Sequence, residues 1–216
     1  MTTRVLMFRW IVFLLAAFYF AEQFWVREFG NMDKFGWQFR YLTIWALTGS
    51  MISAGLMLRP GWGTPGDARG EVLAGLVGVI NMMVVVSYWR LYFTDPALVN
   101  GDNTPVLHRE YYLHLLGPLL QWIDMLWIKR AFRRYAPVAV WLAVLVVVYL
   151  TWTELVVSPL NAEPAGDVTN GLPYPFLNDM VPGQRAIFYG ITFVSGLVFA
   201  AAFRGAQMLL ARRAAR

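Results

Sequence analysis

The sequence predicts an all-α, polytopic membrane protein, built as one bundle of six transmembrane helices. Of its 216 residues, 58% are hydrophobic and only 14% are charged, whereas an ordinary soluble domain is about 25% charged. The apolar residues also gather in stretches about as long as a bilayer-spanning helix. This composition argues against a soluble fold and against disorder. Six spans would use roughly 120 residues, so residues 1–216 are expected to form a single domain.

Six apolar stretches carry this prediction, and each is long enough, or nearly so, to cross a bilayer. They lie at about 8–26, 40–58, 72–94, 107–127, 136–158 and 185–209. The first resembles a signal peptide, but its apolar part is too long and no small-residue cleavage site follows it. It is therefore expected to remain as a span. The fourth is the most polar, and we expect it to face protein or water rather than lipid.

The basic residues predict the orientation, because Lys and Arg accumulate in cytoplasmic loops. Segment 129–134 carries four of them and both tails carry more, whereas the connections at 95–106 and 159–184 contain acids and no base. Both termini are therefore expected in the cytoplasm. This topology explains the net charge of +5 without a nucleic-acid partner. Tails rich in Ala and Arg, in a chain without cysteine, point to a prokaryotic inner-membrane protein.

The 159–184 connection is long and rich in Pro, Gly and Asn, yet its second half, which includes Tyr174 and Phe176, is apolar. Two interpretations are equally suitable. The segment folds back and caps the bundle, or its aromatic residues form an interfacial belt.

Ionisable and polar residues within spans are costly, so each is a candidate site. The expected topology places six of these polar residues in the outer halves of their helices. They are Glu22, Thr43, Arg90, Glu110, His114 and Glu154. A single polar pocket beneath the outer surface would explain this common depth. The alternative is that Glu22, Arg90 and Glu154 extend into the lipid headgroups.

His114 is the most informative of these residues. It stands four positions before Pro118, which cannot donate the backbone hydrogen bond that would close on the His114 carbonyl. We expect a kink with an unpaired acceptor beside the imidazole. A purely structural, hydrogen-bonded histidine remains the alternative.

A histidine base needs a nucleophile, and without cysteine the choice is Ser or Thr. Helical rise places Thr43 within about one turn of the depth of His114. Its hydroxyl has an ordinary alternative partner in the Phe39 carbonyl, and Thr48, Ser50 and Ser53 compete on the same helix. The residue pattern therefore does not select Thr43. No haem, metal or nucleotide motif is present, and no cofactor is expected.

Several motifs resemble the androgen-induced protein 1 family, which includes the androgen-dependent TFPI-regulating protein. They are Phe39-Arg-Tyr-Leu-Thr43, Tyr88-Trp89 with Asp95, His114 with Pro118 and Asp124, Tyr174-Pro-Phe-Leu177, and Pro182-Gly-Gln-Arg-Ala-Ile-Phe-Tyr-Gly190. The last is the most specific, because it matches over a long stretch with nearly fixed spacing.

The resemblance implies a multi-pass membrane hydrolase of fatty acid esters of hydroxy fatty acids or related long-chain esters. It assigns Thr43 as nucleophile and His114 as general base. Candidate oxyanion or substrate contacts are Arg90, Asn81, Tyr111, Glu154, Glu22 and Tyr174. Two alternatives would use the same pocket: a non-catalytic binder or transporter of lipids or small molecules, and a lipid acyltransferase.

Overall fold

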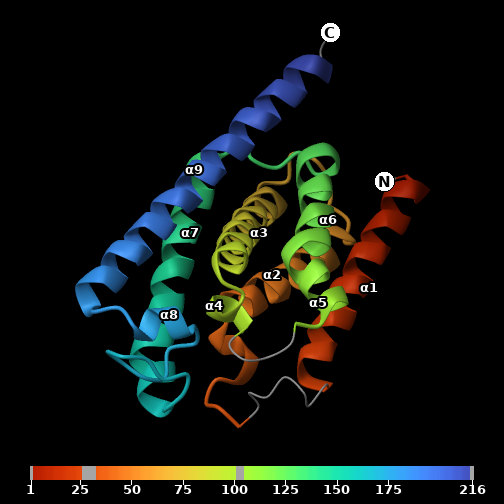
Figure 1. Cartoon of the computed structure of the whole chain (residues 1–216). Helices are drawn as coiled ribbons and strands as arrows, with labels where there is room; N and C mark the ends of the chain where they lie inside the picture. Colours follow the sequence, from red (N-terminus) through yellow and green to blue (C-terminus); the bar gives the residue numbers. More distant parts are fainter. Residues whose placement is uncertain (1, 26–32, 101–104, 215–216) are drawn as a thin grey trace.

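A computed structural model of the chain describes residues 2–25, 33–100 and 105–214, and in these ranges it contains helices but no strand (Figure 1). The long helices are α1 (Thr3–Trp25), α2 (Leu42–Met57), α3 (Ala68–Thr94), α7 (Tyr135–Leu150) and α9 (Pro182–Ala214). The short ones are α4 (Ala97–Asn100), α5 (Leu107–Tyr111), α6 (Gly117–Ile123) and α8 (Pro175–Asn178). Val26, where the first span is expected to end, and part of the 95–106 connection lie outside the described residues.

Four helical segments of the described chain are long and apolar enough to cross a membrane. They are Thr3–Trp25, Gly70–Thr94, Tyr135–Leu160 and Pro182–Arg213. The second expected span is an apolar helix of 16 residues, which at 1.5 Å per residue is shorter than the hydrocarbon core. The structure therefore confirms an all-helical protein and supports a multi-pass membrane protein, but it does not confirm the count of six spans.

The fourth expected span is helical from Leu107 to Ile128, but it is not a regular α-helix. Two π-helical segments, Tyr112–Leu116 and Asp124–Ile128, interrupt it. The first of them directly precedes the turn that contains Pro118, whose ring nitrogen cannot donate a backbone hydrogen bond. The irregularity expected near His114 thus takes the form of a π-helical turn, a feature that is frequent at functional sites.

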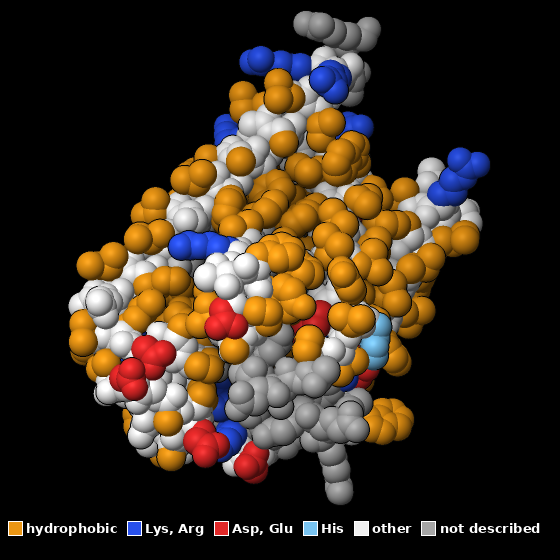
Figure 2. All heavy atoms as spheres, viewed as in Figure 1, with side chains coloured by type: hydrophobic (Ala, Val, Ile, Leu, Met, Phe, Trp, Pro, Cys, Tyr) orange, Lys and Arg blue, Asp and Glu red, His pale blue; other side chains and the backbone are white. Residues whose placement is uncertain are grey.

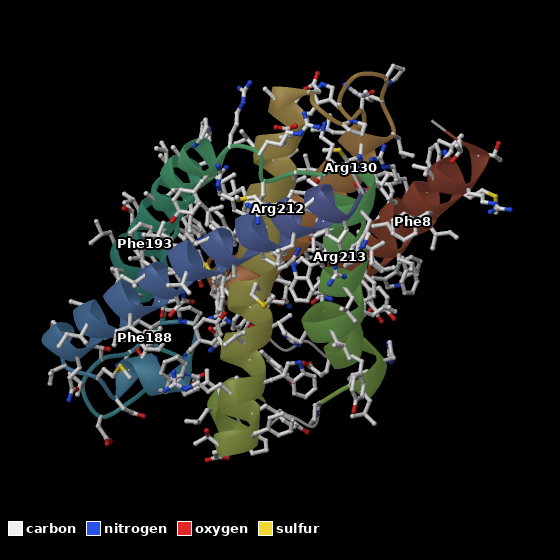
Figure 3. The ribbon with its side chains drawn as sticks, turned by 90° about the horizontal axis from the view of Figure 1, so that it is seen from above. Phe8, Arg130, Phe188, Phe193, Arg212 and Arg213 are labelled. Atoms are coloured by element: carbon white, nitrogen blue, oxygen red, sulfur yellow. The ribbon has the colours of Figure 1, made fainter. Side chains whose placement is uncertain are left out.

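Helix α3 packs against several of the other helices: α2, α6, α7 and α9 all contact it. Its buried residues Val79, Ile80 and Met83 form the centre of the main hydrophobic core, together with Leu142 of α7 and Phe203 of α9. Figure 3 shows α9 crossing α3 and α7 obliquely, with Phe188 and Phe193 on the α7 side of the molecule.

Large apolar side chains remain exposed on the outward faces of the helices, which fits contact with lipid (Figure 2). On α1 these include Ile11, Leu14 and Phe18, and on α7 they include Val140 and Val147. The acidic side chains visible in Figure 2 lie in its lower half, whereas Lys and Arg are prominent near the ends of α1 and α9 at the top.

The segment that joins α7 to α9 folds back over the lower end of the bundle (Figure 1). Leu172 and Leu177 are buried, and Asn178 is fully buried at its centre. The Asn178 amide donates to the carbonyls of Pro164 and Leu172, at 2.8 and 3.1 Å, and its oxygen accepts from the Leu172 amide at 3.2 Å. This segment is hereafter called the cap (residues 161–181). Of the two alternatives, the structure shows the folded-back one.

Candidate active site

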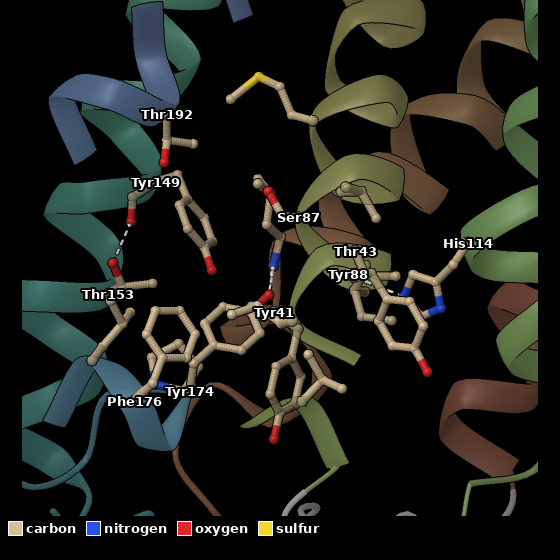
Figure 4. Close-up of a pocket in the computed structure, with 18 of the residues that line it drawn as sticks. Tyr41, Thr43, Ser87, Tyr88, His114, Tyr149, Thr153, Tyr174, Phe176 and Thr192 are labelled. Carbon is tan, nitrogen blue, oxygen red and sulfur yellow. Dashed lines mark hydrogen bonds between the residues drawn. The ribbon is translucent and has the colours of Figure 1, made fainter. Parts of the chain in front are cut away.

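The cap covers a cavity of about 560 Å³ that lies between α2, α3, α7 and α9 (Figure 4). Its inner part is apolar and is lined by Ile80, Met83, Val84, Leu145, Val146 and Phe193. Its outer part is more polar and includes Gln23, Lys34, Gln38 and Glu163. Thr43, Glu110 and His114 lie on its wall. A cavity of this size falls in the range of small-molecule sites.

Thr43 and His114 meet at the cavity wall. The distance from Thr43 Oγ1 to His114 Nε2 is 3.4 Å, and Figure 4 shows the two side chains pointing toward each other from α2 and from the π-helical turn. The ordinary partner of the threonine, the Phe39 carbonyl, instead accepts the indole N–H groups of Trp45 and Trp152, at 2.8 and 3.0 Å. The two tryptophans thus occupy the backbone acceptor with which Thr43 would otherwise pair.

The His114 ring is held on one face and at its far nitrogen. Tyr88 of α3 stacks on the imidazole with a centroid separation of 3.5 Å and an interplanar angle of 4°. Nδ1 lies 3.2 Å from the Glu110 carbonyl and 3.1 Å from the Glu110 carboxylate. An acceptor at Nδ1 favours the tautomer that carries its proton there, which leaves the Nε2 lone pair directed at Thr43.

Tyr174 brings the cap to the same place. Its hydroxyl accepts a 3.2 Å hydrogen bond from the Leu42 amide and interacts with the side chains of Thr43 and Tyr149. Burial raises the pKa of Tyr174 to about 12, so the phenol stays protonated at neutral pH. A neutral hydroxyl donor therefore lies beside the Thr43 oxygen.

The cap is tied to α9 and to the π-helical segment Thr151–Val157, which continues α7, by a second polar cluster around Glu154. The Glu154 carboxylate accepts a 2.6 Å hydrogen bond from Tyr189 and forms a 3.2 Å ion pair with Arg185. Arg185 also donates to the Met180 carbonyl and to Thr169 of the cap, at 2.8 and 3.2 Å. Glu154 thus holds the cap in place and does not line the cavity.

The other candidate residues lie away from the cavity. Glu22 contacts His108 and Arg109, at 3.2 and 3.5 Å. Asn81 is buried and donates to Ser50 at 2.9 Å. Arg90 and Tyr111 are exposed. None of the four lines the cavity, so the single outer pocket includes Thr43, Glu110 and His114 but not the whole set that shares their depth.

Two site residues were not assigned a role from the sequence. Tyr88 belongs to one of the family motifs, whereas no motif contains Tyr149. Their signal is weak, because aromatic residues are common throughout this chain, at 16%. Only the packing of α3 and α7 against the cavity distinguishes these two from the others.

Comparisons with known proteins agree with the motifs. A family model described as FAR-17a/AIG1-like protein matches residues 3–207. No curated protein and no solved structure matches the chain. The family match extends from the start of α1 into the last turns of α9, and so includes every residue of the Thr43–His114 site. The chain therefore belongs to the FAR-17a/AIG1-like protein family.

Proposed function

We propose that this protein is an intramembrane hydrolase of long-chain lipid esters, with Thr43 as nucleophile and His114 as general base. The observation that carries the proposal is the 3.4 Å approach of Thr43 Oγ1 to His114 Nε2 on the wall of a mostly apolar cavity. Catalytic hydrogen bonds are often this long before substrate binds. Fatty acid esters of hydroxy fatty acids, or related esters, are the proposed substrates.

In the first half of the reaction, His114 Nε2 takes the Thr43 proton while Oγ1 bonds to the ester carbonyl carbon. The carbonyl oxygen becomes an oxyanion, and the Tyr174 hydroxyl, which interacts with the Thr43 side chain, is its proposed neutral donor. When the intermediate collapses, the bond from carbon to the leaving oxygen breaks. The imidazolium then gives its proton to that oxygen.

In the second half, water attacks the acyl-threonine ester. His114 takes a proton from the water and returns one to Thr43 Oγ1, so the fatty acid leaves and both side chains are restored. The inner, apolar part of the cavity accepts the acyl chain, because each buried methylene contributes roughly 0.8 kcal/mol.

We also propose six membrane crossings, with both termini in the cytoplasm of a prokaryotic cell. The short helix α2 and the irregular helix over 107–128 would be the two additional crossings. The chain contains no cysteine, so single cysteines can be labelled from one side without background. In oriented vesicles we expect a cysteine at Arg130 to react from the cytoplasmic side and one at Asp167 from the opposite side. Labelling of both from one side would contradict this topology.

The decisive experiment for the activity uses purified protein and a long-chain ester. Thr43→Ala and His114→Ala should abolish turnover while the melting temperature is retained. Labelling by a fluorophosphonate probe should also disappear in Thr43→Ala. Thr48→Ala is the matched control, because the Thr48 hydroxyl donates to the Ile44 carbonyl of its own helix, at 2.6 Å, and Thr48 does not line the cavity. Retained turnover in both site variants would overturn the proposal.

The same experiment separates the alternatives. A lipid binder or transporter would show saturable ester binding without product and would tolerate Thr43→Val. An acyltransferase would depend on Thr43 and His114, but would transfer the acyl group to a second lipid faster than to water.

A further inference from the structure

The proposed proton transfer from Thr43 to His114 uses Nε2 of the imidazole and gives Nδ1 no role. His114 Nδ1 lies 3.1 Å from the Glu110 carboxylate, one helical turn earlier. The Glu110 side chain is 18% exposed and lines the cavity. A largely shielded carboxylate therefore faces the side of the imidazole opposite Thr43.

The neighbouring elements hold this carboxylate in place. Tyr88 of α3, the residue that stacks on the imidazole, also interacts with the Glu110 side chain. Glu110 lies near the end of α5, which continues directly into the π-helical segment Tyr112–Leu116 that contains His114. The acid and the imidazole are therefore carried by one short, continuous stretch of helix. The Tyr88 side chain thus contacts both partners, His114 through its ring and Glu110 through its hydroxyl.

We infer that Glu110 is a positioning residue for His114, an inference that rests on the proposed hydrolase function. The Nδ1 proton is hydrogen-bonded to the Glu110 carbonyl, and the carboxylate adds a negative charge 3.1 Å from the same nitrogen. This charge favours the tautomer protonated at Nδ1 and leaves Nε2 unprotonated and directed at Thr43. It also stabilises the imidazolium that forms once Nε2 has taken the Thr43 proton. That proton passes from Oγ1 to Nε2 and then to the leaving oxygen, and Glu110 itself takes up none.

The other charged and titratable groups around the pair do not replace this carboxylate. Tyr88 approaches from α3 and Thr43 from α2. Arg109, the neighbour of Glu110, contacts Glu22 of α1 at 3.5 Å. Glu22 in turn lies 3.2 Å from His108. Within the part of the chain that the structure describes, Glu110 is the acid that forms an ion pair with His114.

The competing interpretation is that the Glu110 backbone carbonyl, 3.2 Å from Nδ1, orients the ring by itself. Substitution separates the two, because every Glu110 variant keeps the carbonyl and only the side chain changes. Glu110→Gln retains the size of the side chain and removes its charge. Glu22→Gln is the matched control, since it makes the same chemical change in the acid that pairs with His108.

The first measurement is the pH profile of kcat and KM for a long-chain ester. In Glu110→Gln we expect kcat to fall roughly 10²-fold, with KM changed less than about twofold, because the residue acts on the base rather than on ground-state binding. The acidic limb of the kcat profile should move to lower pH, because the variant removes a negative charge 3.1 Å from Nδ1. Glu22→Gln should retain both the kcat and the midpoint of the wild type.

The second measurement does not need turnover. In a Thr43→Ala background, the pH dependence of diethylpyrocarbonate modification is followed separately at His114 and His108, the two histidines of the chain. Adding Glu110→Gln should move the His114 midpoint to lower pH and leave that of His108 in place. Unchanged kcat and unchanged His114 midpoint would overturn the inference in favour of the carbonyl. Activity retained by Thr43→Ala would instead overturn the proposed function, while this titration would still report on Glu110.

Discussion

The indole Nε1 of Trp89 donates a 2.8 Å hydrogen bond to the backbone carbonyl of His114. In a regular α-helix this carbonyl would accept from the residue four positions later, which is Pro118 and has no N–H. A side chain of α3 thus supplies the donor that the proline lacks, and the expectation of an unpaired acceptor at His114 is wrong. The bond ties the turn that carries the imidazole to the helix that carries its stacking partner, Tyr88.

Trp89→Phe should therefore weaken both the fold and the site. It leaves a partly buried carbonyl without this donor, which costs about 1–3 kcal/mol, and it frees the turn that aims His114. We expect a lower melting temperature and a lower kcat with little change in KM. Trp127→Phe is the control, because Trp127 is 57% exposed. A wild-type melting temperature and kcat in Trp89→Phe would contradict this role.

The His114 carbonyl also shows how much of the site can be predicted from the sequence. Pro118, four residues after His114, predicts a missing backbone donor, and that prediction needs only local spacing. The replacement donor comes from α3, 25 residues away. Its identity depends on how α3 is rotated against the neighbouring helix, which local spacing does not determine.

Helix rotation also explains why common depth alone selected too many residues. Arg90 follows Tyr88 by two positions, which is about 200° around an α-helix, so a helix that directs Tyr88 at His114 directs Arg90 outward. Hydropathy located the helical segments well, because it needs no knowledge of rotation. It could not foresee that α2 is only 16 residues long or that two π-helical segments interrupt the fourth span.

Tyr174→Phe tests whether the cap supplies the oxyanion donor. Removing one such donor should lower kcat roughly 10²-fold, and KM should change little because the charge develops only in the transition state. Tyr135→Phe is the control, since the Tyr135 hydroxyl donates to the Leu197 carbonyl at 3.2 Å, outside the cavity. Equal kcat in Tyr174→Phe and wild type would exclude this donor.

The same variant should alter stability at high pH. The Tyr174 pKa is raised from 10.0 to about 12 in the folded protein by burial, so the unfolded chain loses this proton first. The contribution of Tyr174 to the free energy of unfolding is therefore complete below pH 10 and is lost as the pH rises toward 12. The stability difference between wild type and Tyr174→Phe should shrink over this interval, and a difference independent of pH would contradict the assignment.

A buried ion pair closes the other end of the bundle. Arg9 of α1 lies 2.8 Å from Asp124, with side-chain exposures of 2% and 9%, and it also donates to the carbonyls of Met57 and Gly63. Arg9→Met alone leaves a buried carboxylate without its partner and should cost about 3–5 kcal/mol. Arg9→Met/Asp124→Leu removes both charges and should be destabilised less than Arg9→Met. Denaturant unfolding of the two variants measures this, and a double variant less stable than the single one would contradict the argument.

The inner, apolar part of the cavity should set the length of acyl chain that the protein accepts. Leu145 of α7 lies on its wall, eight residues and therefore about 12 Å along the helix from Thr153, another wall residue. Leu145→Trp should fill this inner part, so kcat/KM for long-chain esters should fall by on the order of 10- to 100-fold, the loss of contact with two or three methylenes at about 0.8 kcal/mol each. Short-chain esters should be cleaved as by wild type, because they do not reach it. Val148→Trp places the same bulk on the same helix at a residue that is 48% exposed, and it should leave the chain-length profile unchanged. A uniform loss of activity at all chain lengths in Leu145→Trp would show that the acyl chain binds elsewhere.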